Sequence, residues 1–392
     1  MSGSSSVAPL DLRRTEFPWS ERGDRVYLNH ASTGPLPART LRTLAKWTAS
    51  RGEPWQISDD MEFDVMARAR DLAAGLVGAT PDEIALMTNT SHGINIAARC
   101  LPLRRGDVVL SSDREFPANV YPWMALAREG IIYERVPCTS TGLPDEDAIL
   151  AALDRPHVKV LTISWVSFAT GFTFDLERLG RACRERDIYF VVDAIQGVGV
   201  RPLDAHRCQI DVLACGGQKW LLSPWGTGFA YVRRDLVPTL EPREVGWMAV
   251  RGSDDFNRLV DYDLAWYDDA RRFEVGTLPY QDLAGFCVSV EMLLDVGIDC
   301  ISSHVTALID TMMTRLADAG AVIVTPANRV RRAGILTVHA DHAERVSDRL
   351  ARARIVCGLR EGAIRLSPHF YNNHDDVHRA VDVLLRTAES PE

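Results

Sequence analysis

Hydrophobic residues occur along the chain in short runs that are separated by amphipathic stretches. Six runs are typical of buried strands, and they cover residues 83–88, 107–112, 131–136, 158–165, 188–194 and 211–217. Helical spacing of apolar residues follows several of them, as at 91–101 and 175–186, and it also predicts a helix from Asp60 to Leu76. Strands that alternate with helices favour an α/β fold in which helices cover both faces of a largely parallel sheet.

The pattern changes near residue 286. A long helix is predicted over 288–320, followed by short strands at 321–325, 334–340 and 363–370 and a closing helix at 374–390. This order is typical of a smaller α+β domain. The first residues are rich in Ser and then basic, as in a loose tail. We therefore expect three parts: a flexible tail at 1–22, a large α/β domain at 23–285 and a C-terminal α+β domain at 286–392.

Composition narrows the functional classes. The 392 residues are 46% hydrophobic and 25% charged, which is typical of a globular protein with a substantial core. The formal net charge of −9 and the lack of a long basic run argue against a nucleic-acid partner. No apolar run has the roughly 18 residues of a membrane span, and the first residues lack the apolar core of a secretion signal. We expect a cytoplasmic enzyme that does not bind membranes.

The eight cysteines are scattered, and none has a Cys or His partner at the spacing of a zinc site. Most of them lie among apolar residues, so we expect them to be reduced and structural. No metal site is expected.

Two charged residues stand where predicted strands end. Asp193 closes the run 188–194, and Lys219 follows the run 211–217. Ligands of parallel sheets gather at this edge. Pyridoxal phosphate needs a lysine that forms a Schiff base with its aldehyde, and an acid that keeps its pyridine nitrogen protonated so that the ring withdraws electrons from the substrate Cα. On spacing alone, a structural ion pair is an equal alternative.

Several further segments follow in the order of a known family. They are YLNHASTGPLP at 27–37, TNTSHGIN at 88–95, EFPANVYPW at 115–123, DAIQ at 193–196, RFEVGT at 272–277 and AIRLSPHFYN at 363–372. Together they resemble the class V aminotransferase family of fold-type I pyridoxal-phosphate enzymes, which holds cysteine desulfurases, isopenicillin N epimerases and kynureninases. The resemblance runs from Tyr27 nearly to the C-terminus. It implies a large domain with a mainly parallel seven-stranded sheet and a smaller C-terminal α+β domain.

The resemblance implies a role for the segment at 88–95. Thr90, Ser91 and His92 would offer amides and hydroxyls to the cofactor phosphate at the start of a helix. Without a ligand, Thr90 or Ser91 would be an ordinary N-cap. In the same family pattern, Lys219 bonds to the cofactor and Asp193 contacts its ring nitrogen.

Other cofactor contacts follow from the remaining segments. Phe116 would stack on the pyridine ring, although an aromatic residue alone is more often part of a core. Gln196 would lie near the ring hydroxyl or the phosphate, and Gln218 would help to bind the phosphate. Gly276 and Thr277 would reach the phosphate of the neighbouring subunit. The resemblance therefore implies a homodimer with shared active sites.

The substrate is expected to be a small amino acid. Arg365 would hold its α-carboxylate, a role that suits the two-pronged guanidinium group. Asn29 and His30, in the loop at 27–37, would also contact it.

Two departures from the family pattern bear on the reaction. Cysteine desulfurases carry a nucleophilic cysteine about 15 residues before the arginine, whereas Cys357 lies nearer and inside an apolar run, so a desulfurase is disfavoured. Trp165 stands where relatives often keep Asn or His near the ring hydroxyl. We expect an aminotransferase or a β-eliminating C–S lyase. An epimerase of the isopenicillin N type is the alternative, and an inactive family member comes third.

A nicotinamide-dependent dehydrogenase is disfavoured, because no GxGxxG turn follows the first strand. The sequence leaves open the substrate, the pathway, and the choice among transamination, elimination and epimerisation.

Overall fold

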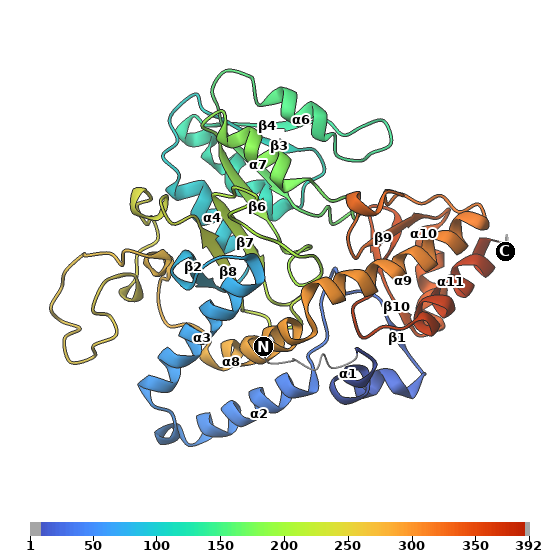
Figure 1. Ribbon diagram of the computed structural model, residues 1–392, viewed down its shortest axis with the longest axis horizontal. Helices are drawn as coiled ribbons and strands as arrows, with labels where there is room; N and C mark the ends of the chain where they lie inside the picture. The colour runs from blue at the N-terminus through green and yellow to red at the C-terminus, as the bar shows by residue number, and fades with distance from the viewer. Residues whose placement is uncertain (1–8, 389–392) are drawn as a thin grey trace, which may run out of the picture.

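Seven strands form the central sheet of the computed structural model, which describes residues 9–388 (Figure 1). In spatial order they are β2 (Ile84–Met87), β8 (Gly228–Val232), β7 (Val212–Gly216), β6 (Tyr189–Asp193), β5 (Val158–Ser164), β3 (Val108–Ser112) and β4 (Ile132–Val136). Only β8 is antiparallel to its neighbours; the other pairs in the sheet are parallel. The mainly parallel seven-stranded sheet is confirmed, and the six predicted runs supply every strand except β8.

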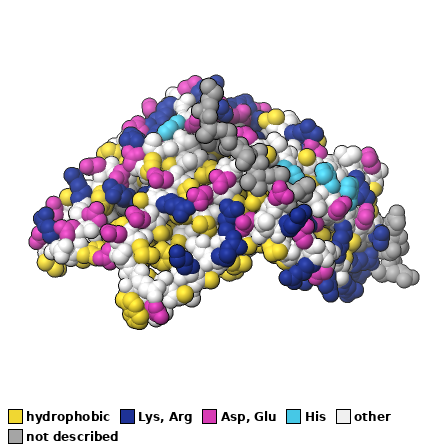
Figure 2. Space-filling model, turned by 60° about the horizontal axis from the view of Figure 1, so that its bottom comes forward, with side chains coloured by type: hydrophobic (Ala, Val, Ile, Leu, Met, Phe, Trp, Pro, Cys, Tyr) yellow, Lys and Arg dark blue, Asp and Glu magenta, His cyan; other side chains and the backbone are white. Residues whose placement is uncertain are grey.

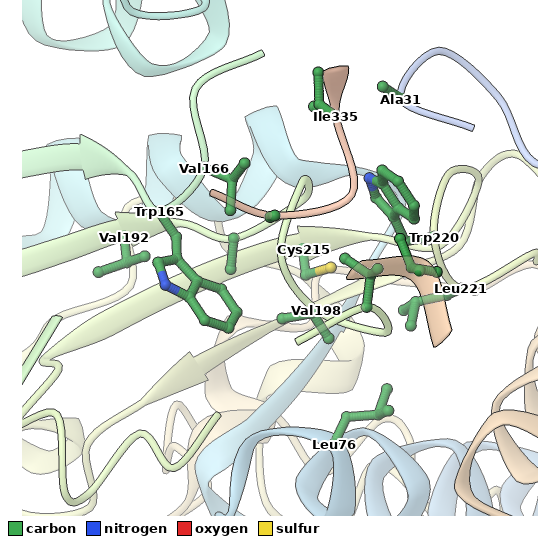
Figure 3. Packing of buried hydrophobic residues seen from close by; sticks show 14 of the residues in the cluster. Ala31, Leu76, Trp165, Val166, Val192, Val198, Cys215, Trp220, Leu221 and Ile335 are labelled. Atoms are coloured by element: carbon green, nitrogen blue, oxygen red, sulfur yellow. The ribbon is translucent and has the colours of Figure 1, made fainter. Parts of the chain in front are cut away.

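Helices cover both faces of this sheet, which is why β2, β3, β7 and β8 are buried along their whole length. The helices of this part are α2 (Ala38–Gly52), α3 (Asp59–Val77), α4 (Thr90–Cys100), α5 (Tyr121–Ala125), α6 (Glu146–Ala152), α7 (Leu176–Arg184) and α8 (Tyr280–Val296). Apolar side chains form a cluster on each face. Trp165, Cys215 and Trp220 belong to the larger cluster (Figure 3).

The expected long helix over 288–320 is two helices. Helix α8 packs against α2 and α3 of the large unit, and α9 (Ile298–Asp318) begins after Gly297 (Figure 1). Gly297 has a φ of +87°, a conformation that most other residues avoid and that interrupts helical geometry. The large unit therefore continues through α8, past the boundary expected at residue 286.

The C-terminal unit contains a three-stranded antiparallel sheet in the order β11-β12-β9. Its elements after α9 are β9 (Leu336–His339), α10 (Ala343–Arg352), β10 (Ile355–Val356), β11 (Gly358–Arg360), β12 (Ala363–Leu366) and α11 (His374–Ala388). The strand expected at 321–325 makes only a single bridge, between Ile323 and Val338. In residues 9–388, no helix has both the length and the apolarity required to cross a membrane.

The N-terminal segment differs from the expected flexible tail. Residues Pro9–Glu16 form helix α1, and β1 (Val26–Tyr27) pairs in parallel with β10 of the C-terminal unit. The Phe17 ring is fully buried and stacks on Tyr371 with a centroid separation of 4.0 Å. Residues 9–22 are therefore folded onto the C-terminal unit; residues 1–8 of the expected tail lie outside the described part.

Large hydrophobic side chains are exposed on a loop that projects from the body between η7 (Trp247–Ala249) and η8 (Ala270–Phe273) (Figure 1). On this loop, Val260, Tyr262 and Leu264 are 74%, 91% and 67% exposed. The face drawn in Figure 2 also shows hydrophobic side chains among interspersed acidic and basic ones. Several large hydrophobic side chains exposed together on one loop are typical of a surface that contacts another molecule.

Candidate active site

Asp193 and Lys219 lie at the carboxyl edge of neighbouring strands. Asp193 is the last residue of β6, and Lys219 follows the end of β7. Burial raises the pKa of Asp193 to about 6, even though its carboxylate accepts a hydrogen bond from the Ile195 N–H. Burial lowers the pKa of Lys219 to about 8, with the Asp193 carboxylate opposing the shift. Lys219 therefore has far more neutral, nucleophilic amine near neutral pH than an ordinary lysine.

The Phe116 ring lies over this lysine. Its centroid is 5.5 Å from Lys219 Nζ, and its edge meets Phe168 with a centroid separation of 5.3 Å. The side chain is 41% exposed, so it is not a core residue. A half-exposed aromatic face above the reactive amine fits the expected stacking position.

Glu115 is a half-buried acidic residue that the sequence did not single out. It accepts hydrogen bonds from the N–H and the hydroxyl of Ser164. Ser164 pairs with Asp193 between the neighbouring strands β5 and β6. Burial raises its pKa to about 7, and the nearby Asp193 charge adds to the shift. Asn119 links the same loop to β5, because its Oδ1 accepts from the Thr162 hydroxyl at 2.6 Å. Glu115 thus fixes the loop that carries Phe116.

The start of α4 lies against β7. A Cβ on Gly93 would be 2.6 Å from the Cβ of Ala214, so only glycine permits this approach. The N-cap is Asn89, whose side chain accepts from the His92 N–H at 3.0 Å, and neither Thr90 nor Ser91 has that role. The cap leaves the hydroxyl of Thr90 available.

The Thr90 hydroxyl lies close to Gly216. Its Oγ1 is buried and has no hydrogen-bond partner among the described residues. A Cβ on Gly216 would lie 3.2 Å from this oxygen and 2.5 Å from Gln218 Oε1. A buried hydroxyl and an amide side chain therefore meet beside a glycine at a helix start, as a bound phosphate requires.

The side chains of Ser91 and His92 have other surroundings. Ser91 is exposed. His92 Nε2 is 3.8 Å from Glu244, and burial lowers the pKa of the imidazole. Their side chains face the surface near Arg99, so a contribution to phosphate binding would come from their backbone.

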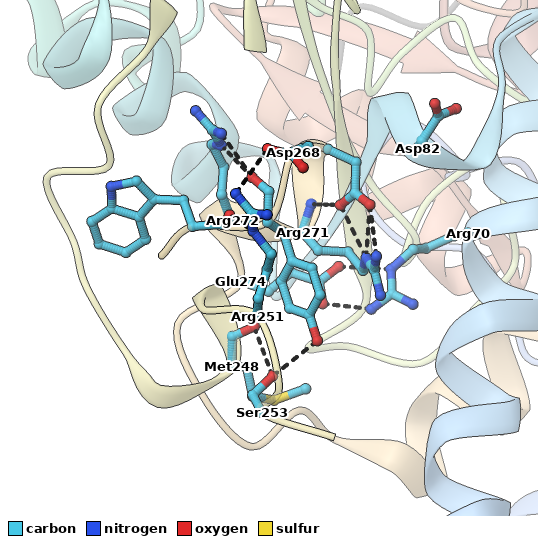
Figure 4. A network of polar contacts seen from close by, with 12 residues as sticks. Arg70, Asp82, Met248, Arg251, Ser253, Asp268, Arg271, Arg272 and Glu274 are labelled. Carbon is cyan, nitrogen blue, oxygen red and sulfur yellow. Dashed lines mark hydrogen bonds and ion pairs between the residues drawn. The ribbon is translucent and has the colours of Figure 1, made fainter. Parts of the chain in front are cut away.

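The segment with Gly276 and Thr277 is anchored by ionic contacts (Figure 4). Arg70 Nη2 is 2.6 Å from Glu274, and Glu274 also accepts from the Leu86 N–H of β2. Thr277 is exposed and lines a separate cavity of about 450 Å³ with Trp247, Tyr280 and others. The segment is thus held rigidly while Thr277 remains open to a neighbouring molecule.

Gln196 and His30 use their polar atoms within the protein. Gln196 donates to the Ala31 carbonyl at 3.0 Å and accepts from Trp220 Nε1 at 2.8 Å. The ring nitrogens of His30 are 2.7 Å from the Ser367 carbonyl and 2.9 Å from the Tyr371 hydroxyl. Burial holds the pKa of His30 well below its usual value. This geometry favours a role in fastening the loop at 27–37, and contact with cofactor or substrate stays a prediction.

Arg365 lies on β12 and is 1% exposed. Its Nη1 donates to the Phe168 carbonyl at 2.9 Å, and its Nη2 donates to Ser32 Oγ at 2.7 Å. Within the described chain, neither Arg365 Nε nor Asn29 Oδ1 has a hydrogen-bond partner. Burial, together with the charge of Arg360, lowers the pKa of Arg365 to about 10. A buried guanidinium that has a free N–H fits the expected carboxylate clamp.

These residues fit pyridoxal phosphate. Lys219 has a lowered pKa, Asp193 is a buried acid, Phe116 offers an aromatic face, and Thr90 leaves an unpaired hydroxyl beside Gly216. The family model described as aminotransferase class-V matches residues 26–379.

The chain belongs to the class V aminotransferase family. It is therefore a pyridoxal phosphate-dependent enzyme of fold type I, as its motifs implied. A protein named probable cysteine desulfurase from Methanothermobacter thermautotrophicus is 31% identical, over 72% of this chain and 70% of that protein. The isopenicillin N epimerase of Amycolatopsis lactamdurans is 28% identical, over 91% of this chain and 94% of its own.

Solved structures share the fold of this class V chain. The cystine C–S lyase C-DES, in complex with cysteine persulfide, superposes with a TM-score of 0.85 at 22% identity. The match covers 93% of this chain and 98% of that chain. Another structure of C-DES holds glycine covalently linked to its PLP cofactor.

Of the two residues that depart from the family pattern, Cys357 is half-buried and Trp165 is buried. Cys357 lies between β10 and β11, and burial raises the pKa of its thiol to about 11, so the thiol is protonated at neutral pH. Trp165 is 5% exposed within the larger hydrophobic cluster (Figure 3).

Proposed function

We propose that this class V enzyme binds pyridoxal phosphate on Lys219 and acts at the α-amino group and Cα of an amino acid, as an aminotransferase or a β-eliminating C–S lyase. The observation that carries this proposal is the position of Arg365. Its buried guanidinium has no acidic partner among residues 9–388, and its charge lowers the pKa of Lys219. An anion clamp thus lies within electrostatic reach of the reactive amine.

Each residue then has a definite task. When bound, pyridoxal phosphate supplies an aldehyde for the substrate amine and a ring that withdraws electrons. Arg365 holds the α-carboxylate and thereby orients the Cα–H bond. Lys219, whose pKa is lowered to about 8, takes the proton from Cα and returns it at the next step. Asp193 keeps a negative charge beneath the site and favours a protonated ring nitrogen.

The place where the proton returns distinguishes the candidate reactions. If Lys219 delivered the proton away from Cα, the outcome would be transamination, and if it assisted the departure of a β-substituent, the outcome would be a lyase. The likeness in fold to a cystine C–S lyase makes sulfur a natural leaving atom to test. A desulfurase is disfavoured because it needs a thiolate, and the thiol of Cys357 is protonated. An epimerase needs a second acid on the opposite side of Cα, for which the sequence offers His30, His92 or Tyr280. Of these, His30 has both nitrogens bonded.

An absorbance spectrum tests this proposal. Wild-type protein supplied with pyridoxal phosphate is expected to absorb near ~420 nm, the band of a lysine–cofactor imine. Lys219→Ala removes the band, and Lys46→Ala, which changes an exposed lysine on α2, keeps it. Cysteine, cystine, alanine and glutamate are then added while keto acid, released sulfur and inverted isomer are assayed. A wild type without the band would overturn the proposal, and inverted product alone would replace it with an epimerase.

We also propose that the enzyme is a homodimer in which Thr277 serves the partner's site. Thr277 is exposed, lies in a cavity apart from Lys219, and adjoins the loop with Val260, Tyr262 and Leu264. Mixing a Lys219→Ala subunit with a subunit changed at Thr277 is expected to restore one working site per pair. Equal inactivity of the mixed and separate variants would contradict shared sites.

A further inference from the structure

Arg360 shares a hydroxyl group with the clamp. Its Nη2 donates to Ser32 Oγ at 3.1 Å, and Arg365 Nη2 donates to the same oxygen at 2.7 Å. The remaining hydrogen bonds of the two guanidinium groups go to carbonyl oxygens, of Leu359 and Phe168. No carboxylate of residues 9–388 forms an ion pair with either arginine. Two positive charges therefore converge on one neutral hydroxyl.

The hairpin of β11 and β12 produces this arrangement. Gly358 pairs with Arg365 across the hairpin, so the two residues face the same side of the sheet. Arg360 is two residues beyond Gly358 and therefore faces that side as well. Arg360 ends β11 beside the turn and is exposed, whereas Arg365 is buried. One guanidinium thus lies inside the site and the other at its mouth.

Gly358 lets the backbone of β11 approach the clamp and the loop closely. A Cβ at this position would lie 3.2 Å from Asn29 Oδ1 and 3.3 Å from Arg365 Nε, the two buried atoms without partners. The unpartnered Nε–H of Arg365 is therefore available to one carboxylate. That group would leave the charge of Arg360 uncompensated, because a single carboxylate neutralises one of the two cations.

We propose that Arg360 and Ser32 form a subsite for a second anionic group, so that the preferred substrates are amino acids whose side chain ends in a carboxylate. This inference rests on the proposed function, since it assigns the α-carboxylate to Arg365. The distal carboxylate binds at the mouth, where Arg360 meets solvent, and Ser32 keeps the two guanidinium groups at a fixed separation. The charge of Arg360 also reaches Lys219, whose pKa it lowers.

Substrate pairs of equal shape test this subsite in the holoenzyme. Wild type is expected to prefer glutamate to glutamine, and aspartate to asparagine, by about 10-fold in kcat/KM, the effect of one charge-assisted hydrogen bond near solvent. Arg360→Gln reduces both preferences to near unity through KM, and Arg360→Lys restores part of them. Arg354→Gln is the matched control, because it removes another exposed arginine of this unit, one paired with Asp24, and leaves the preferences intact.

Binding without turnover separates this inference from the proposed function. Titration calorimetry is expected to show that glutarate binds more tightly than valerate, which has the same carbon chain and one carboxylate. Arg360→Gln lowers the affinity for glutarate by about 10-fold and the affinity for valerate much less. Equal affinity of wild type for the two acids overturns the subsite. An equal loss of affinity for both acids in the variant also overturns it, because Arg360 would then bind the α-carboxylate. If no amino acid reacts while the glutarate result holds, the proposed function and the substrate preference fail, and only the anion-binding role of Arg360 stands.

Discussion

Arg13 and Arg365 are both buried arginines, yet their surroundings are opposite. Every guanidinium nitrogen of Arg13 has a partner, including Asp376 at 2.7 Å and Glu21 at 2.7 Å. Burial acts to lower the pKa of Arg13, but these two carboxylates raise it above its usual value. Arg365 has no carboxylate partner among the described residues, one nitrogen without a bond, and a pKa lowered to about 10.

The difference separates structural from functional burial of charge. A buried ion with all its bonds made fastens two parts of the chain, here α1 to α11. A buried ion that has a hydrogen-bonding group without a partner lowers the stability of the ligand-free protein. Such an ion is tolerated where a bound ligand supplies the missing partner. Arg13 is of the first kind, and Arg365 is of the second.

The largest effect on stability is expected at Arg13. Arg13→Met leaves the carboxylate of Asp376 buried without its cation, so the free energy of unfolding should fall by about 3–5 kcal/mol. The kcat/KM of the remaining folded enzyme should stay near the wild-type value. Urea unfolding and steady-state kinetics measure the two quantities. A loss of kcat/KM at unchanged stability would show that Arg13 belongs to the active site.

The opposite result is expected for Arg365→Met. Removing a charge that has no acidic partner should leave the unfolding free energy within about 1 kcal/mol of wild type, or raise it. The substrate carboxylate loses its partner, so kcat/KM should fall by about 100-fold. A variant that loses stability and keeps its kcat/KM would make Arg365 a structural residue like Arg13.

A smaller and pH-dependent effect is expected for Asp193→Asn in the protein without cofactor. The folded state raises the pKa of Asp193 from about 3.8 to about 6, so its proton is held more tightly than in the unfolded chain. Wild-type stability therefore falls as pH rises from about 4 to 6, and the variant escapes this loss. Above pH 6 the variant should be more stable by on the order of 2–3 kcal/mol, although inactive. Unfolding curves at pH 4 and pH 8 measure the gain, and an equal gain at both values would contradict it.

Much of the sheet could be predicted because buried parallel strands are continuous apolar runs. β8 was not identified among the apolar runs. It is antiparallel to β7, and an antiparallel neighbour needs only a short connection, so no intervening helix marks it in the sequence. The tail was misjudged because its composition gives no sign of Arg13 meeting Asp376, which is 363 positions away.

The site shows the same limit. Lys219, Asp193 and Arg365 could be singled out as candidates because strand ends and family motifs mark them. Asn89, Thr90 and Ser91 are all able to cap a helix, so the sequence alone could not say which one does. Ser32, Glu115 and Arg360 act through contacts between distant segments, and only the folded chain reveals these contacts.

The pairing of β1 with β10 also sets an order of events during synthesis. At roughly 5–20 residues per second, the N-terminal segment leaves the ribosome tens of seconds before its partners in the last part of the chain. The central sheet, with Asp193 and Lys219, can form in that interval. The loop with Asn29 and Ser32 reaches its position only when β12 and α11 emerge. A newly made chain therefore carries the amine of Lys219 before the proposed carboxylate clamp is assembled, and we expect activity only after β12 and α11 have been translated.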